Sequence, residues 1–221
     1  MDSPYAAGGG GHDFRKVPCQ NIQDIRGQAS KKNGIKWLKC GSLPAKADPG
    51  KQNAYFESTL NPLIEKEKSG NIALLFLDAS HFVMGGDFLG HIYGKTPRLV
   101  RTFSGRQRYN VLGALDDISK KVHTVTNDTY ITATEVCTML HKIASEYKEL
   151  PVHLVLDHAR YQKCAAVQEL AEKLGITLES IPPYSPNLNL IERIWKFTKG
   201  ELRSKYYDDF ESFREKINHV A

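Results

Sequence analysis

The chain has 221 residues, which suits one core domain with extensions, and 41% of them are apolar, as in an ordinary globular protein. No apolar run approaches the roughly 18 residues of a transmembrane helix, and the N-terminal stretch lacks the apolar segment of a signal peptide, so no membrane insertion is expected. The four cysteines form no CxxC pair and indicate free thiols in a cytoplasmic protein.

The formal charge of +5 lies entirely at the start of the chain, since residues 1–51 hold nine Lys or Arg and four Asp or Glu. Such a stretch suits a polyanionic partner, although a solvated tail has the same composition. Residues 1–34 include a four-glycine run and no apolar period, so they predict a disordered basic leader. Residues 35–69 predict a linker and then a helix over 52–69, whose regularity Pro62 limits.

The first half of the predicted core domain, residues 70–221, is rich in strands. Ile72 to Leu77 is an unbroken apolar run, typical of a central strand buried on both faces, and Asp78 is expected to end it. Two or three further strands are expected around residues 91–94, 108–115 and 122–127. A capping box from Thr132 to Glu135 then predicts the start of a core-facing helix.

The second half alternates strands and helices. A strand over 152–156 ends at Asp157, an apolar stripe after it predicts a helix closed by Gly175, and residues 176–181 predict another strand. Two more helices are expected, one opened by the segment around Asn189 and one capped near Asp209. The β-α-β unit over 152–181 predicts parallel strands, and sites in such sheets lie beyond the carboxyl ends of the strands.

Three acids therefore stand out: Asp78, Asp157 and Glu192, with 34 residues between the last two. Cleaving a phosphodiester needs an activated water and a stabilised leaving oxygen, which two divalent ions about 3.5–4 Å apart supply. Carboxylate oxygens suit Mg²⁺. Two structural alternatives stay open, because turn amides could satisfy Asp78 and Glu192 could be the capping partner of Asn189. Rival acids in polar or turn-like surroundings are Asp87, Asp116, Asp117 and Asp128.

A basic hairpin is expected between Lys95 and Leu115, which contains no acid. It could follow a phosphate backbone or be an ordinary solvated hairpin. The candidate nucleic-acid-binding residues are its five cations and two cations near the acids: Lys95, Arg98, Arg101, Arg106, Arg108, Arg160 and Lys196. The nearby histidines, His81 and His158, are interpreted as structural. Tyr184 and Trp195 could stack on bases, but packing in a turn or the core is the simpler interpretation.

Three blocks, LFLDASHF, LVLDHARYQKC and IPPYSPNLNLIERIWKFTK, resemble the catalytic domain of mariner-like DDE transposases of the bacterial insertion-sequence branch. The resemblance covers about residues 36–219. It implies an α/β, RNase H-like fold with a mixed five-stranded sheet flanked by helices. It also implies DNA cleavage and strand transfer with two Mg²⁺ or Mn²⁺ ions, held by Asp78, Asp157 and Glu192. The implied partners are double-stranded DNA and a second copy of the chain in a homodimer. The implied location is the cytoplasm of a bacterium, in association with the nucleoid.

The chain departs from the family pattern in two places. His158 stands where the family commonly has Asn, and the residues before the core show no helical period that would form a helix-turn-helix DNA-binding domain. The sequence therefore resembles a catalytic domain without its end-recognition module. Two alternatives remain: another RNase H-like nuclease, such as a resolvase, and a non-catalytic remnant that binds DNA or full-length subunits.

Overall fold

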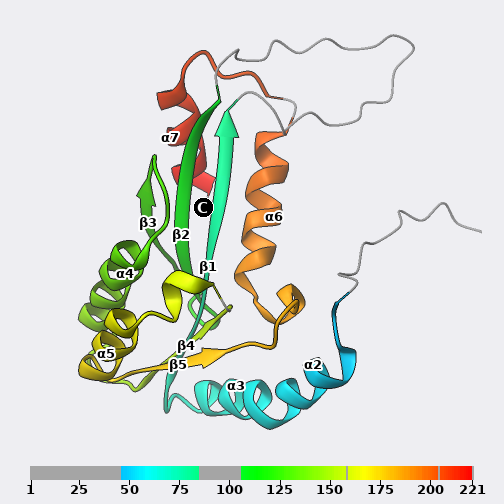
Figure 1. The fold of residues 1–221 in the computed structure, drawn as a ribbon, viewed down its shortest axis with the longest axis vertical. Coiled ribbons are helices and arrows are strands. Elements are labelled where there is room, and N and C mark those ends of the chain that lie inside the picture. The colour runs from blue at the N-terminus through cyan, green and yellow to red at the C-terminus, as the bar shows by residue number, and fades with distance from the viewer. Residues whose placement is uncertain (1–45, 85–105, 158, 204, 221) are drawn as a thin grey trace, which may run out of the picture. The chain divides into compact units, whose positions relative to one another are not determined.

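The computed structural model describes residues 46–84, 106–157, 159–203 and 205–220, which belong to one compact unit, Pro44–Ala221. These residues form a five-stranded sheet with the order β3-β2-β1-β4-β5 (Figure 1). Its strands are β1 (Ala73–Met84), β2 (Gln107–Asp116), β3 (Val122–Asn127), β4 (Val152–Leu156) and β5 (Ile176–Ser180). The predicted leader and the strand expected at 91–94 lie outside the described residues.

The sheet is mixed, as expected. β1, β2 and β3 pair antiparallel, whereas β1 with β4 and β4 with β5 pair parallel. The prediction that Asp78 ends the first strand is wrong, because β1 continues to Met84. β2 pairs with it along that whole length, from Leu75 opposite Asp116 to Met84 opposite Gln107. β4, in contrast, pairs with β1 only as far as Phe76.

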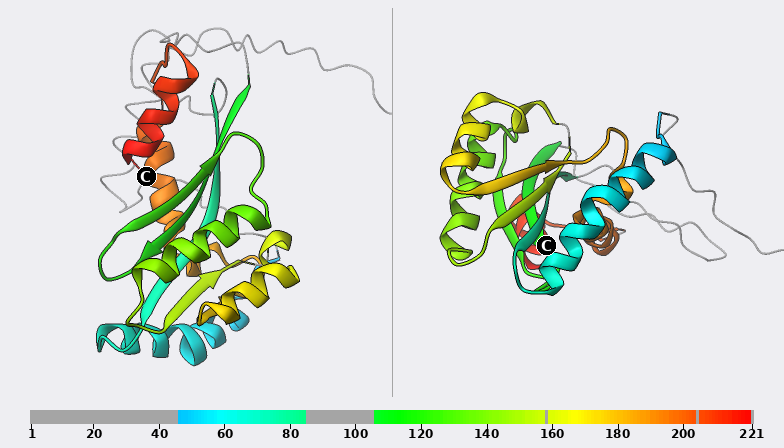
Figure 2. Two further views of the ribbon diagram at one scale, coloured as in Figure 1. Left: turned by 90° about the vertical axis from the view of Figure 1, so that its left-hand side faces the viewer. Right: turned by 90° about the horizontal axis from the view of Figure 1, so that it is seen from below.

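Helices cover both faces of the sheet (Figures 1 and 2). On one face, α4 (Ala133–Glu146) and α5 (Ala165–Lys173) pack on Leu75 and Leu77 of β1. On the other, α6 (Ile191–Leu202) and α7 (Phe210–Val220) pack on Leu74, Phe76 and Phe82. This division follows from the alternation of side chains along a strand. It explains why the apolar run of β1 has no polar face.

The helix expected over residues 52–69 is observed in three parts: α2 (Pro49–Tyr55), a π-helical turn (Phe56–Leu60) and α3 (Asn61–Lys68). Pro62 lies in the first turn of α3, directly after the wide turn, where its missing N–H is tolerated. Leu60 and Leu63 join the same core cluster as α6 and α7.

Local signals in the sequence place the other helix ends. The capping box is present, since the Thr132 N–H donates to Glu135 at 2.7 Å and the Thr134 N–H donates to the Thr132 hydroxyl at 3.2 Å. Gly175 follows α5 with φ of 69°, the left-handed conformation that closes a helix. No helix in the described ranges is long and apolar enough to cross a membrane.

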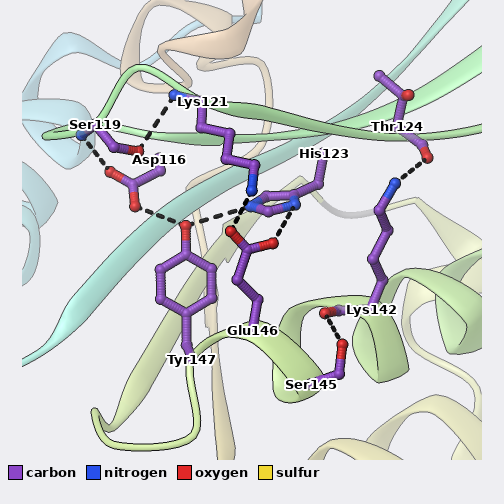
Figure 3. A network of polar contacts seen from close by, with 9 residues as sticks. All are labelled: Asp116, Ser119, Lys121, His123, Thr124, Lys142, Ser145, Glu146 and Tyr147. Carbon is purple, nitrogen blue, oxygen red and sulfur yellow. Dashed lines mark hydrogen bonds and ion pairs between the residues drawn. The ribbon is translucent and has the colours of Figure 1, made fainter.

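Polar contacts join β2 and β3 to the end of α4 at the edge remote from β4 (Figure 3). Asp116 accepts hydrogen bonds from the Tyr147 hydroxyl at 2.7 Å and from the Ser119 N–H at 2.8 Å, and His123 lies 3.2 Å from the same hydroxyl. Burial opposes ionisation of Asp116, but these hydrogen bonds outweigh it and leave the pKa lowered. Asp116 is therefore a satisfied structural acid and no longer a rival for the site.

Candidate active site

The pairing of β1 with β4 brings Asp78 and Asp157 to the same edge. Phe76 lies opposite Val155 in parallel register, and each aspartate follows two residues later along its own strand direction. Two residues return a side chain to the same face, which here is the face of Phe76 and Val155, covered by α6. Since β4 ends at Leu156, Asp78 lies where β1 has just lost its neighbour, inside a strand rather than at its end.

Glu192 reaches the same edge from the first turn of α6. That helix presses closely on the sheet, because a Cβ at Gly113 would lie 2.7 Å from Trp195 Cη2 and 2.8 Å from Ile191 Cδ1. Gly113 is the residue of β2 directly opposite Asp78. The absence of a side chain there therefore lets α6, and Glu192 with it, approach the aspartates.

Asp78, Asp157 and Glu192 line one pocket with a volume of about 420 Å³. The rest of its wall is the β5–α6 connection together with Ala159; the connection contributes Ile181, Pro182, Pro183, Tyr184, Ser185, Pro186 and Asn189. None of the salt bridges among the described residues involves the three acids. The pocket is therefore an acidic one, with a proline-rich wall.

Asp78 and Glu192 both have raised pKa values in this pocket. Burial and then the charge of Glu192 raise the pKa of Asp78 to about 7, and Asp157 adds to this, although hydrogen bonds from Ala79 and Trp195 oppose the shift. Burial also raises the pKa of Glu192, where Lys199 opposes the shift and Asp157 adds to it. A divalent cation in the pocket would relieve this repulsion.

The β5–α6 connection is held by side chains that the sequence did not single out. Tyr184 has φ of 58°, a strained value for a residue other than glycine, and its carbonyl accepts a hydrogen bond from Gln52 Nε2 at 3.3 Å. Asn187 Nδ2 donates to Gln52 Oε1 at 3.2 Å. The residue Gln52 of α2 thus fixes the rim of the pocket.

Asn189 does not cap α6, contrary to one of the two interpretations of this segment. Its side-chain amide donates to the Leu77 carbonyl at 2.9 Å instead, and α6 has Leu190 at its N-cap without a side-chain capping bond. Leu77 lies just past the last β1 residue paired with β4, so its carbonyl needs another donor. Asn189 supplies it, and Glu192 is left to face the pocket.

The carboxylate donors suit Mg²⁺ or Mn²⁺ in kind, since both ions prefer oxygen ligands. Among the described residues, however, no three His, Cys, Asp or Glu side chains are gathered closely enough to form a ready metal cluster. One carboxylate oxygen of Asp157 accepts a hydrogen bond from the Ala159 N–H at 3.2 Å. One carboxylate oxygen of Asp78 accepts a hydrogen bond from the Trp195 indole N–H at 3.0 Å. The chemistry of the donors therefore fits a divalent ion, and closing the set requires side-chain movement.

The candidate DNA-binding cations are only partly described. Arg106, Arg108, Arg160 and Lys196 are exposed, and Arg108 lies 5.8 Å from the ring centroid of Tyr130. Three others, Lys95, Arg98 and Arg101, lie outside the described residues, as does His158.

His81 contacts Asn110 Oδ1 at 2.6 Å, which supports its structural interpretation. Trp195 is 2% exposed and is a core residue, whereas Tyr184 is half exposed at the pocket.

A mixed sheet ordered β3-β2-β1-β4-β5 with helices on both faces is an RNase H-like fold. A family model described as DDE superfamily endonuclease matches residues 73–214, and the chain belongs to that family. The matched span contains all three acids of the pocket.

Solved transposase structures share the fold. The Mos1 transposase paired-end complex with left transposon end has a TM-score of 0.66 and 14% identity, over 89% of this chain and 62% of that one. The Mos1 strand transfer complex has a TM-score of 0.60 and 16% identity, over 89% and 61%. A Mos1 mariner paired end complex with Mn has a TM-score of 0.59 and 14% identity, over 89% and 62%. This chain thus spans about three fifths of those chains. No curated protein matches it.

Proposed function

We propose that this chain is a transposase catalytic domain that cleaves DNA and transfers strands with two Mg²⁺ or Mn²⁺ ions held by Asp78, Asp157 and Glu192. The observation that carries the proposal is that three acids from β1, the end of β4 and α6 line one pocket without a neutralising ion pair among the described residues. Membership in the DDE endonuclease family and the fold shared with Mos1 support it.

The position of each acid would determine its role in binding the ions. Asp78 and Asp157, on neighbouring parallel strands, would hold the inner side of the ion site, and Glu192 would close it from α6. When bound, the ions would activate the attacking hydroxyl and stabilise the leaving oxygen. The proline-rich connection would narrow the entrance, and the exposed cations Arg160 and Lys196 would contact phosphates on the DNA backbone.

Relatives of known structure suggest the partners. Mos1 has been solved in paired-end and strand transfer complexes, and with Mn or Mg. We propose double-stranded DNA, at element ends and at target, as the substrate of this chain, and a homodimer as its working form. Analytical sedimentation with and without DNA would measure whether the chain forms that homodimer.

The first prediction tests the proposed activity. Asp157→Asn keeps the size of the side chain but removes a charge that holds the ions, so we expect Mg²⁺- or Mn²⁺-dependent nicking of supercoiled DNA to fall at least about a hundredfold. Asp208→Asn, at an exposed acid outside the pocket, is the matched control and should nick at the wild-type rate.

Nicking that persists in Asp157→Asn, or that survives EDTA, would contradict the assignment of the site. A wild-type chain that binds DNA but never nicks it would favour the non-catalytic alternative.

A further inference from the structure

The indole of Trp195 makes a contact that its packing does not require. The ring is 2% exposed, and its N–H donates to Asp78 Oδ2 at 3.0 Å. A buried indole N–H needs an acceptor, and a backbone carbonyl would serve. Here the acceptor is instead a carboxylate of the proposed ion site, on a strand 117 residues earlier in the chain.

The ring has little freedom to move away from that carboxylate. Its Cη2 and Cζ2 atoms lie 2.7 and 2.8 Å from where a Cβ of Gly113 would be, so the ring rests directly on the backbone of β2 opposite Asp78. Phe82 meets it edge to face, with the ring centroids 6.3 Å apart. The donor is therefore fixed relative to β1, and the plane of the Asp78 carboxylate is constrained with it.

The chemistry of the donor matters as much as its position. A lysine or arginine at this place would orient Asp78 but would also cancel its charge. The neutral indole engages one oxygen and leaves the negative charge, with the remaining lone pairs, available to a cation. Trp195 also follows Glu192 by three residues on α6, about 4.5 Å along the helix axis. One rigid helix thus carries both a proposed ligand and the orienting group of another.

We infer that Trp195 is a positioning residue that orients Asp78 for binding a divalent cation and couples the placement of Glu192 to that of Asp78. The inference rests on the proposed function, because it assumes that Asp78 is a ligand. It assigns Trp195 a task in the ion site beyond filling the core.

The hydrogen bond can be tested without any metal. The sequence has two tryptophans, so Trp37→Phe leaves one indole N–H, which nitrogen-15 NMR resolves. In that background we expect Asp78→Asn to move the indole proton resonance and speed its exchange with solvent. An indole signal that Asp78→Asn leaves unchanged would overturn the inference.

The second measurement is Mn²⁺ affinity, by calorimetry or by the loss of the free-ion EPR signal. Trp195→Phe keeps an aromatic ring but removes the donor, and loss of such an orienting group typically lowers metal affinity about 10- to 100-fold. Phe82→Leu is the matched control, since it disturbs the packing of the same ring while leaving its N–H in place. We expect its affinity to stay within about threefold of wild type, well below the Trp195→Phe effect.

The outcomes separate the two proposals. If Trp195→Phe binds Mn²⁺ as tightly as wild type, or if Phe82→Leu weakens binding equally, the positioning role is overturned while the proposed function stands. If the wild-type chain binds no Mn²⁺ although it is folded, the proposed function fails, and the inference that depends on it fails too.

Discussion

At the scale of single residues, Glu67 shows how much this fold tolerates a buried acid away from the pocket. Its side chain is 3% exposed, one carboxylate oxygen accepts a hydrogen bond from the Leu74 N–H at 3.2 Å, and the other has no partner in the described structure. Burial raises the pKa of Glu67 to about 7; the Leu74 hydrogen bond opposes the shift, and Asp117 and Asp116 add to it. Glu67 is therefore protonated in the folded chain under mildly acidic conditions.

This shift predicts a dependence of stability on pH. The unfolded chain releases the proton near the ordinary value of 4.5 and the folded chain near 7, so in between the folded state binds more protons. The free energy of unfolding contributed by Glu67 is present below pH 4.5 and is lost as pH rises to about 7. Glu67→Gln removes this titration, and urea unfolding should show it more stable than wild type at pH 8 by about 1–3 kcal/mol.

The same comparison at pH 4.5 should show a much smaller difference, because both side chains are then neutral. Asp78, whose pKa is also about 7, titrates in both proteins and cancels in the comparison. An equal difference at the two pH values would mean that folding does not raise the pKa of Glu67.

At the scale of elements, the contact between α6 and β2 decides how closely Glu192 approaches the aspartates. Ile191, Trp195, Thr198 and Leu202 form the buried stripe of α6, and Trp195 and Ile191 straddle Gly113. The exposed side of the same helix carries Lys196 and Phe197. The helix thus combines a tightly fitted inner face with an outer face open to a partner.

Gly113→Ala tests this fit. The new methyl group would lie 2.7 Å from a rigid ring, so α6 must move outward, and we expect a loss of about 1–3 kcal/mol in stability together with weaker Mn²⁺ binding. Gly200→Ala, within α6, meets no atom within 4 Å and should instead stabilise the chain by about 0.5–1 kcal/mol. Thermal unfolding and calorimetry measure both, and a harmless Gly113→Ala would show that α6 is not tightly seated.

The sequence predicts these elements better than it predicts their contacts. Apolar runs and local caps, such as Thr132 with Glu135, act over a few residues and can be read directly from the sequence. The three acids that line the pocket can be read from the sequence as well. The extension of β1 to Met84 depends on pairing with β2, and the bond from Trp195 to Asp78 joins residues 117 apart. Nothing local encodes either contact. A buried indole is a signal that an acceptor is needed, but it does not say which one.

At the scale of the whole molecule, charge is divided between the start of the chain and the core. Residues 1–51 carry the whole formal excess of +5, because residues 52–221 hold 21 Lys or Arg and 21 Asp or Glu. Contacts to phosphates hold a protein on DNA without reading its sequence. We therefore expect weak DNA binding by this chain, without preference for particular ends.

Salt dependence measures that expectation. With about five phosphate contacts, raising salt from 50 to 200 mM should lower DNA affinity by about two to three orders of magnitude. Deleting residues 1–34 should flatten the slope of log affinity against log salt, and Lys196→Ala should reduce it by about one unit. The control is a scrambled duplex of equal length, and a strong preference for a terminal repeat over it would reveal a base-reading element in the chain.

The short pairing of β1 with β4 has a further consequence, for how this protein tolerates mutation. The residues that set the register are Ala73 to Phe76 against Val152 to Val155, and all of them except the half-buried His153 are buried core residues. A slip by one residue would turn Asp78 to the face that α4 and α5 cover, and it would exchange Leu75 and Leu77 with Leu74 and Phe76 between the two core clusters. Both clusters would then have to repack, so the packing of the core and the placement of the aspartates depend on the same register. A substitution that disturbs this register is therefore expected to lower stability and to misplace the two aspartates together.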